Sequence, residues 1–174
     1  GSVGGEVSGL NSLVGSAVND QVGGHGITAL TGGRYVVRSD AWGGGKGAVT
    51  LGKADGSSVG AVNLGNSLVG SVATDKVGGG GITALSSGHY AVVSAAWGGG
   101  KGAVTWGNND GSTVGEVTAG NSLVGSATTD KVGSGGITQL AANGNYVVKS
   151  PEWGSTYTKM GAVTFVDGSN GHIS

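Results

Sequence analysis

The hexapeptide Asn-Ser-Leu-Val-Gly-Ser occurs three times, starting at Asn11, Asn66 and Asn121, with 55 residues between successive copies. Periods of this length indicate repeat architectures, in which one unit cannot bury its apolar face without a neighbour. The 174 residues are therefore predicted to form one repeat domain. Its expected parts are an extra strand in residues 1–10, unit one in 11–65, unit two in 66–120 and unit three in 121–174.

Insertions in the third unit show where exposed connections are expected. One extra residue lies near 141–144, three lie in 155–160, and two are lost between Val163 and Asp167 relative to Val104 and Asp110. Length changes are tolerated in surface loops rather than in packed elements. These points are therefore predicted to be loops between strands.

Short runs rich in Val, Ile, Thr and Tyr lie between the loops. In unit one they span 26–30, 35–39, 47–51 and 59–63. Each is bounded by turn-forming residues, and Asp-Gly pairs such as Asp55-Gly56 are strong hairpin signals. Because no stretch shows a sustained apolar period of 3.6 residues, the chain is predicted to be all-β, with four antiparallel strands in each unit.

Composition excludes several classes of protein. Glycine supplies 41 residues, but the net charge is only −1, which is too low to keep a disordered chain open. The absence of Cys excludes disulfides and thiolate metal sites. Nine Lys and Arg residues make nucleic-acid binding improbable, and no apolar run is long enough to insert into a membrane.

One unit resembles a known repeat. The order Asp75-Lys76-Val77-Gly78, Gly81–Leu85, Tyr90–Ser94 and Gly102–Thr105 resembles the FG-GAP blade of integrin-α-type β-propellers. The units are also similar to repeats of bacterial surface haemagglutinin-like and adhesin-like proteins. The resemblance implies β-propeller blades and a location outside the cell or on a bacterial surface.

Two departures from the FG-GAP pattern affect what it implies. The first hairpin carries no carboxylate in any unit, so no calcium or other metal site is expected there. Propellers have about four to eight blades, so three units fall short of a ring. We therefore expect self-association into a symmetric ring of two or three chains, or a longer array, or a closed three-fold β-prism or β-trefoil.

Repeated aromatic side chains are the first candidates for a binding site. Trp42, Trp97 and Trp153 recur after the second strand, beside a glycine-rich loop. An exposed indole there would stack on a sugar ring, as in binding to cell-surface glycans. The favoured interpretation is that each Trp packs between neighbouring units.

Repeated carboxylates are the second candidates. Asp20, Asp75 and Asp130 precede the Val-Gly pair of their units. They could contact a ligand, although the favoured interpretation is that each accepts hydrogen bonds from the amides of its own turn. No second repeated carboxylate accompanies them, so an acid/base pair is not expected.

Nothing in the sequence predicts a catalytic residue or a cofactor. The Gly-Gly-Gly-Lys-Gly runs at 43–47 and 98–102 lack the Ser or Thr and the helix of a phosphate loop. We therefore expect a non-enzymatic extracellular module for multivalent binding or adhesion. The alternatives are a lectin with one sugar site per unit and a self-assembling structural module without a ligand.

Overall fold

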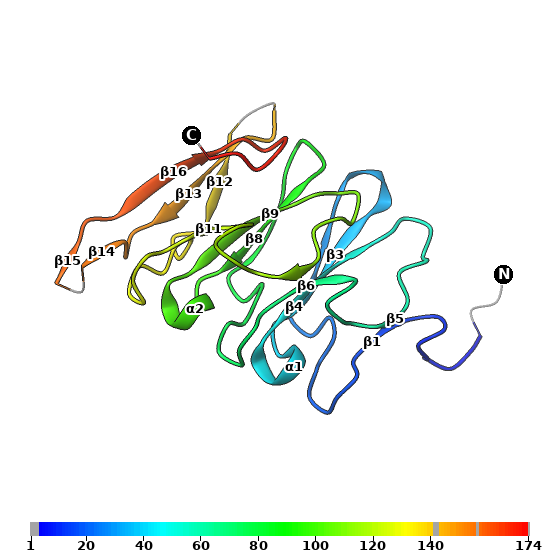
Figure 1. Cartoon of the computed structure of the whole chain (residues 1–174). Helices are drawn as coiled ribbons and strands as arrows, with labels where there is room; N and C mark the ends of the chain where they lie inside the picture. The colour runs from blue at the N-terminus through cyan, green and yellow to red at the C-terminus, as the bar shows by residue number, and fades with distance from the viewer. Residues whose placement is uncertain (1–3, 141–142, 156, 174) are drawn as a thin grey trace.

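The computed structural model describes residues 4–140, 143–155 and 157–173. It is an all-β chain in which three main sheets, of three to five strands each, follow one another along the molecule in the order of the units (Figure 1). Two residues of the expected insertion near 141–144, Ala141 and Ala142, lie outside the described residues, as does Thr156.

Each sheet is built on a three-stranded antiparallel meander. The strands are rich in Val, Thr, Tyr and Ala, and pair over their whole length; Tyr35 to Ser39, for example, lie opposite Gly52 to Ala48. The strands are β2 (Ile27–Ala29), β3 (Tyr35–Ser39) and β4 (Ala48–Gly52); β7 (Gly81–Ala84), β8 (Tyr90–Ser94) and β9 (Ala103–Gly107); and β12 (Ile137–Gln139), β13 (Tyr146–Ser150) and β16 (Ala162–Val166).

The fourth antiparallel strand of a sheet comes from the following unit, not from the same unit as the sequence predicted. The Ser-Leu-Val part of the repeated hexapeptide forms β6 (Ser67–Val69), which pairs with β4, and β11 (Leu123–Val124), which pairs with β9. The unit borders at 66 and 121 therefore separate strands that share a sheet.

The segments expected to be fourth strands form short parallel pairs instead. β5 (Gly60–Ala61) pairs with β1 (Leu13–Val14), and β10 (Gly115–Glu116) pairs with β6. Residues 4–10, the described part of the expected extra strand, contain no strand. Their counterparts in units one and two pair with the first strand of the same unit, β1 and β6.

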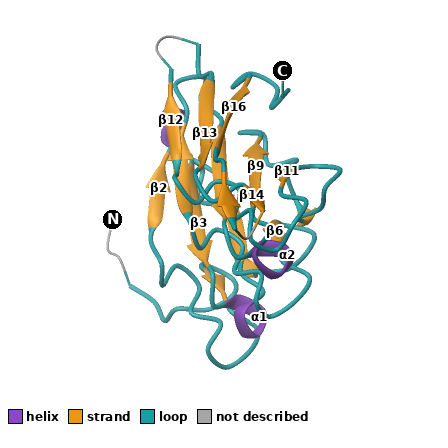
Figure 2. Cartoon of the chain, turned by 90° about the vertical axis from the view of Figure 1, so that its left-hand side faces the viewer, coloured by secondary structure: helices purple, strands orange, loops and turns teal. Residues whose placement is uncertain are grey.

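Connections lie at the ends of the strands. The glycine-rich runs fold into the one-turn helices α1 (Trp42–Gly45) and α2 (Trp97–Gly100), and the first hairpin of unit one turns through the 3-10 segment η1 (Thr31–Gly33). In unit three the inserted residues form the hairpin β14 (Gly154–Ser155) and β15 (Thr158–Lys159). Helices α1 and α2 lie at the same end of the strands (Figure 2).

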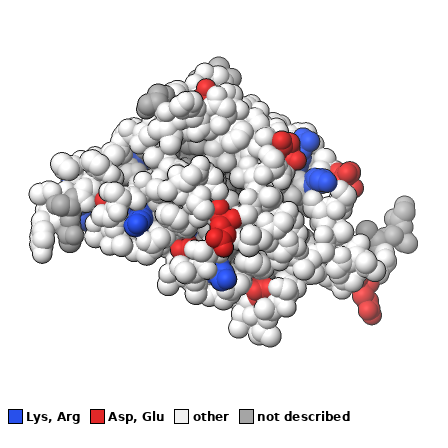
Figure 3. All heavy atoms as spheres, in the orientation of Figure 1, with Lys and Arg blue, Asp and Glu red and all other residues white. Residues whose placement is uncertain are grey.

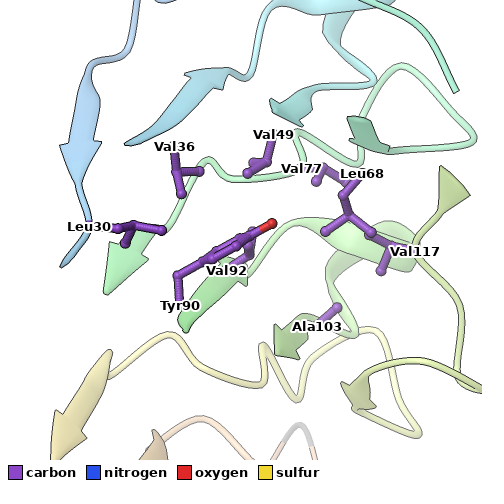
Figure 4. Packing of buried hydrophobic residues seen from close by; sticks show 9 residues of the cluster. All are labelled: Leu30, Val36, Val49, Leu68, Val77, Tyr90, Val92, Ala103 and Val117. Carbon is purple, nitrogen blue, oxygen red and sulfur yellow. The ribbon is translucent and has the colours of Figure 1, made fainter. Parts of the chain in front are cut away.

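The core lies between neighbouring sheets. Val36 and Val49 of the first sheet face Tyr90 and Val92 of the second, with Leu68 and Val77 beside them (Figure 4). A second cluster joins the second sheet to the third; it includes Val93, Val104, Val132, Tyr146 and Val148. Burial of these side chains supplies the main favourable term in holding the units together.

One glycine at the end of the third meander strand is required by packing. A Cβ on Gly52 would overlap the ring of Tyr35 on the neighbouring strand, and Gly107 has the same relation to Tyr90. The tyrosine ring covers the glycine backbone across the strand pair. Within the described residues, no helix is long and apolar enough to span a bilayer.

Candidate functional site

The repeated aspartates organise the turn that begins each unit. Asp75 is buried, and its Oδ2 accepts hydrogen bonds from the amides of Ser71 (2.8 Å) and Val72 (3.0 Å). Its Oδ1 accepts one from the amide of Gly98 in α2, at 3.0 Å. We call this arrangement the Asp turn; it fastens the start of a unit to the glycine-rich loop of the same unit.

The same arrangement recurs in units one and three. Asp20 accepts from Ser16, Ala17 and Gly43, and Asp130 accepts from Ser126, Ala127 and Gly154. Both carboxylates are buried. Both oxygens of each aspartate are thus used inside the protein rather than presented to solvent.

Electrostatics agree with this geometry. Burial acts to raise the pKa of Asp20, but the amides of Gly43, Ala17 and Ser16 together outweigh it and hold the pKa below its ordinary value. The amide of Ala127 lowers the pKa of Asp130, with Gly154 and Ser126 assisting against burial. Both groups are therefore anions at neutral pH.

The residue after each Asp has an unusual backbone. Gln21, Lys76 and Lys131 have φ values of 46°, 45° and 43°, in the left-handed region that non-glycine residues rarely occupy. In units two and three this conformation directs two successive amides at the preceding unit: Lys76 and Val77 donate to the carbonyls of Gly45 and Lys46 at 3.1 and 3.0 Å. Lys131 and Val132 donate to Gly100 and Lys101 in the same way.

The three tryptophans are not equivalent. Trp42 and Trp97 are half-buried against core clusters, and their indole N–H groups are buried without a hydrogen-bond partner among the described residues. Trp153 is 39% exposed, because the inserted hairpin changes the loop around it. Only Trp153 therefore presents an open indole of the kind that stacking on a sugar needs.

Three buried serines also recur and were missed from the sequence. Ser39, Ser94 and Ser150 accept a hydrogen bond, each at 3.1 Å, from the amide of the glycine in the Val-Gly pair. Their signal was present, because each is the last residue of its central strand in the aligned units. They hold the turn against the sheet.

A surface groove of about 330 Å³ lies beside the third sheet. Its lining includes Trp106, Asn121, Leu123, Tyr146 and Val166. No carboxylate, imidazole or amine is among the described residues that line it. Such a lining supports packing or hydrogen bonding rather than proton transfer.

Charged groups are sparse and scattered on the face shown in Figure 3. Within the described part of the chain, no three His, Cys, Asp or Glu residues lie together in a way that could hold a metal ion. The unit-specific His25 pairs with Asp40 instead of forming part of a larger cluster.

The fold and the Asp turns define an all-β tandem-repeat protein whose units exchange strands. The chain belongs to the family described as Repeat of unknown function (DUF5650), whose model matches residues 1–24, 29–79, 84–134 and 140–174. No curated protein matches the chain.

Proposed function

We propose that this chain is a non-enzymatic extracellular module that acts in multivalent binding or adhesion. The observation that carries the proposal is the placement of the glycine-rich loops: α1, α2 and the hairpin β14–β15 follow one another along the same edge of the molecule (Figure 1). Three loops at equivalent places in the units, two of them alike in sequence, thus lie along one edge of the molecule.

Such a layout suits weak, repeated contacts. When one unit has bound, its neighbours are held near the same surface at a high effective concentration, so avidity exceeds the affinity of a single unit. The likeness of the units to adhesin-like repeats is what suggests a bacterial surface and cell-surface glycans as partners.

Binding to an immobilised glycan panel tests multivalency. The wild-type chain should bind a dense surface much more tightly than a dilute one, because only the dense surface engages several units. Equal apparent affinity on dense and dilute surfaces would contradict multivalent binding. Complete absence of binding would remove glycans as the ligand class.

A lectin is the second candidate, and the exposed indole of Trp153 favours it at one unit rather than at all three. Trp153→Ala should abolish glycan binding while the thermal transition stays near that of the wild type. Val18→Ala, at an exposed position in unit one, is the control and should bind normally. Retained binding by Trp153→Ala would exclude the indole as the sugar platform.

A self-assembling structural module is the third candidate, and the exposed end faces of the stack favour it. In this proposal the sheets are propeller-type blades of the FG-GAP kind, and two or three chains complete a symmetric ring. Light scattering on a gel-filtration column tests it: a discrete dimer or trimer supports a ring, and a monomer at every concentration contradicts it.

A further inference from the structure

The last sheet exposes an apolar face, whereas the corresponding faces of the first and second sheets are buried. Val163 is 71% exposed, whereas Val49 and Val104 at the same position are 1% and 3% exposed. The strand register shows that these three valines are equivalent. Val163 pairs with Lys149 on the central strand of its sheet. Val49 pairs with Arg38 and Val104 with Val93 at the same position of the first and second sheets. We call the outward side of β13 and β16 the tail face; terminal units that end a stack normally carry a polar outer face instead.

Inside the molecule, the corresponding face is filled by the Val-Gly pair of the next unit. A Cβ on Gly78 would contact Val49 and Arg38, and one on Gly133 would contact Val104 and Val93. In return, a Cβ on Gly102 would overlap the backbone of Val132. The two backbones therefore meet with room for glycine only.

On the tail face the same position is an open groove of about 470 Å³. Its lining includes Lys149, Pro151, Met160, Gly161 and Val163. Gly161 is the counterpart of Gly102, since each donates its amide to the carbonyl of the Trp in its loop. A Cβ on Gly161 would meet only atoms of its own unit, at 3.7 Å or more.

The start of the chain has the shape that fits this groove. Residues 13–24, here called the head segment, contain Val22 and Gly23, the counterparts of Val77 and Gly78. Gln21 already has the left-handed backbone of Lys76. The amides of Gln21 and Val22 find no acceptor in the described part of the chain, whereas those of Lys76 and Val77 bond the preceding unit.

The family model matches the chain in four segments, and their boundaries fall at repeated positions. Its complete units end after the Val-Gly turn, at residues 79 and 134, and the first partial match ends at the equivalent residue 24. Two matches begin at residues 29 and 84, and the last begins at residue 140, one position beyond the equivalent residue 139. The first match thus ends where the head segment ends.

We propose that a second copy of this chain docks head to tail on the tail face. Its Val22 and Gly23 fill the groove, and its β1 adds antiparallel to β16, with Leu13 opposite Val163. The amides of Gln21 and Val22 donate to the carbonyls of Lys159 and Met160, as Lys76 and Val77 do to Gly45 and Lys46. Because head and tail are different surfaces, the contact is heterologous and leads to a closed ring or an open filament.

Complementary variants test this geometry without relying on any ligand. Val163→Asp damages only the tail, and Ile27→Asp, at a residue 65% exposed beside the head segment, damages only the head. Both positions are exposed in the single chain, so the fold should remain. Leu64→Asp is the control, because Leu64 is 52% exposed and belongs neither to the head segment nor to the strands of the tail face.

Sedimentation velocity over a concentration series gives the readout. The wild type and Leu64→Asp should self-associate, and each end variant should raise the dissociation constant by about a hundredfold, because a buried unpaired charge is costly. An equimolar mixture of the two end variants should form a 1:1 complex, since each supplies the end that the other has lost.

Three results would overturn the proposal. The first is a wild type that stays monomeric at every concentration. The second is self-association that neither end variant weakens. The third is loss in Val163→Asp alone without rescue by mixing, which would indicate a tail-to-tail contact. Glycan binding by the proposed loops would be unaffected by any of these results, so the two proposals fail separately.

Discussion

Gly98 donates its amide hydrogen to Oδ1 of Asp75 at 3.0 Å, across 23 residues of sequence. The bond joins the first turn of unit two to the glycine-rich loop that follows the central strand of that unit. The same pair recurs as Asp20 with Gly43 and as Asp130 with Gly154. Each aspartate therefore links two loops, and its removal should destabilise both of them.

Replacing the central aspartate should destabilise the whole stack. Asp75→Ala leaves the amides of Ser71, Val72 and Gly98 without their acceptor, and we expect a loss of about 2–4 kcal/mol in the free energy of unfolding. Urea denaturation followed by tryptophan fluorescence measures it. Asp55→Ala, at an exposed turn, should leave the midpoint nearly unchanged; equal shifts in the two variants would contradict the linking role of Asp75.

Acid should destabilise the protein through the Asp turns. The pKa values of Asp20 and Asp130 are lower in the folded chain than in the unfolded chain, so their contribution is complete above the unfolded pKa of about 3.8. It declines as the pH falls through the folded pKa. Thermal unfolding between pH 7 and pH 2 should therefore show the transition falling below about pH 4.

The matched variant for acid unfolding is Asp130→Asn, which cannot ionise. It should be less stable than the wild type at neutral pH and lose less stability on acidification. If the stability of Asp130→Asn fell with decreasing pH as steeply as that of the wild type, the acid sensitivity would come from other carboxylates.

Replacing a glycine by alanine should lower the stability strongly only where the glycine lies against the backbone of the neighbouring unit. Gly102→Ala places its Cβ on the backbone of Val132, and we expect a loss of more than about 2 kcal/mol. Gly99→Ala has a similar φ of 71°, but its nearest neighbour is 3.9 Å away, so only the strain of about 1 kcal/mol remains. Chemical denaturation gives the free energy of unfolding of both variants, and the difference between them measures the contact apart from the backbone strain.

Gly161→Ala extends the comparison to the open end. In dilute solution it should behave like Gly99→Ala, because no following unit covers it. A loss as large as that of Gly102→Ala under those conditions would mean that the tail groove is filled within a single chain.

Truncating the middle tryptophan should weaken packing. Trp97 packs against the cluster between the first and second sheets, so Trp97→Ala should cost about 2–4 kcal/mol. Trp153→Ala should cost much less, because that indole is exposed. Calorimetric transition temperatures check the order, and the reverse order would contradict the packing of Trp97.

The sequence was sufficient for the period, the all-β class and most strand positions. The segments 35–39 and 47–51 fall on β3 and within one residue of β4, because short runs that contain Val, Tyr or Thr between turn residues indicate strands. The exchange of strands was not predictable. A strand as short as Leu68–Val69 carries no sign of which neighbour it will join, since every copy has the same pattern.

The candidate site was also predictable only in part. Repetition located Asp20, Asp75 and Asp130, and turn chemistry explained their amide bonds. It did not reveal the left-handed backbone at Gln21, Lys76 and Lys131, because Gln and Lys, unlike Gly, carry no sign of a positive φ. Nor could it separate Trp153 from Trp42 and Trp97, since exposure there follows from the inserted hairpin.

The exchange of strands has a genetic consequence. Leu68 pairs with Val49 and Leu123 with Val104, at the same separation along the chain, so both junctions between units are made by equivalent partners. Recombination that adds or removes one whole period therefore recreates an intact junction wherever the crossover falls. Copy number can change between generations without any new contact having to evolve, whereas a deletion that removes part of a strand breaks the sheet that contains it.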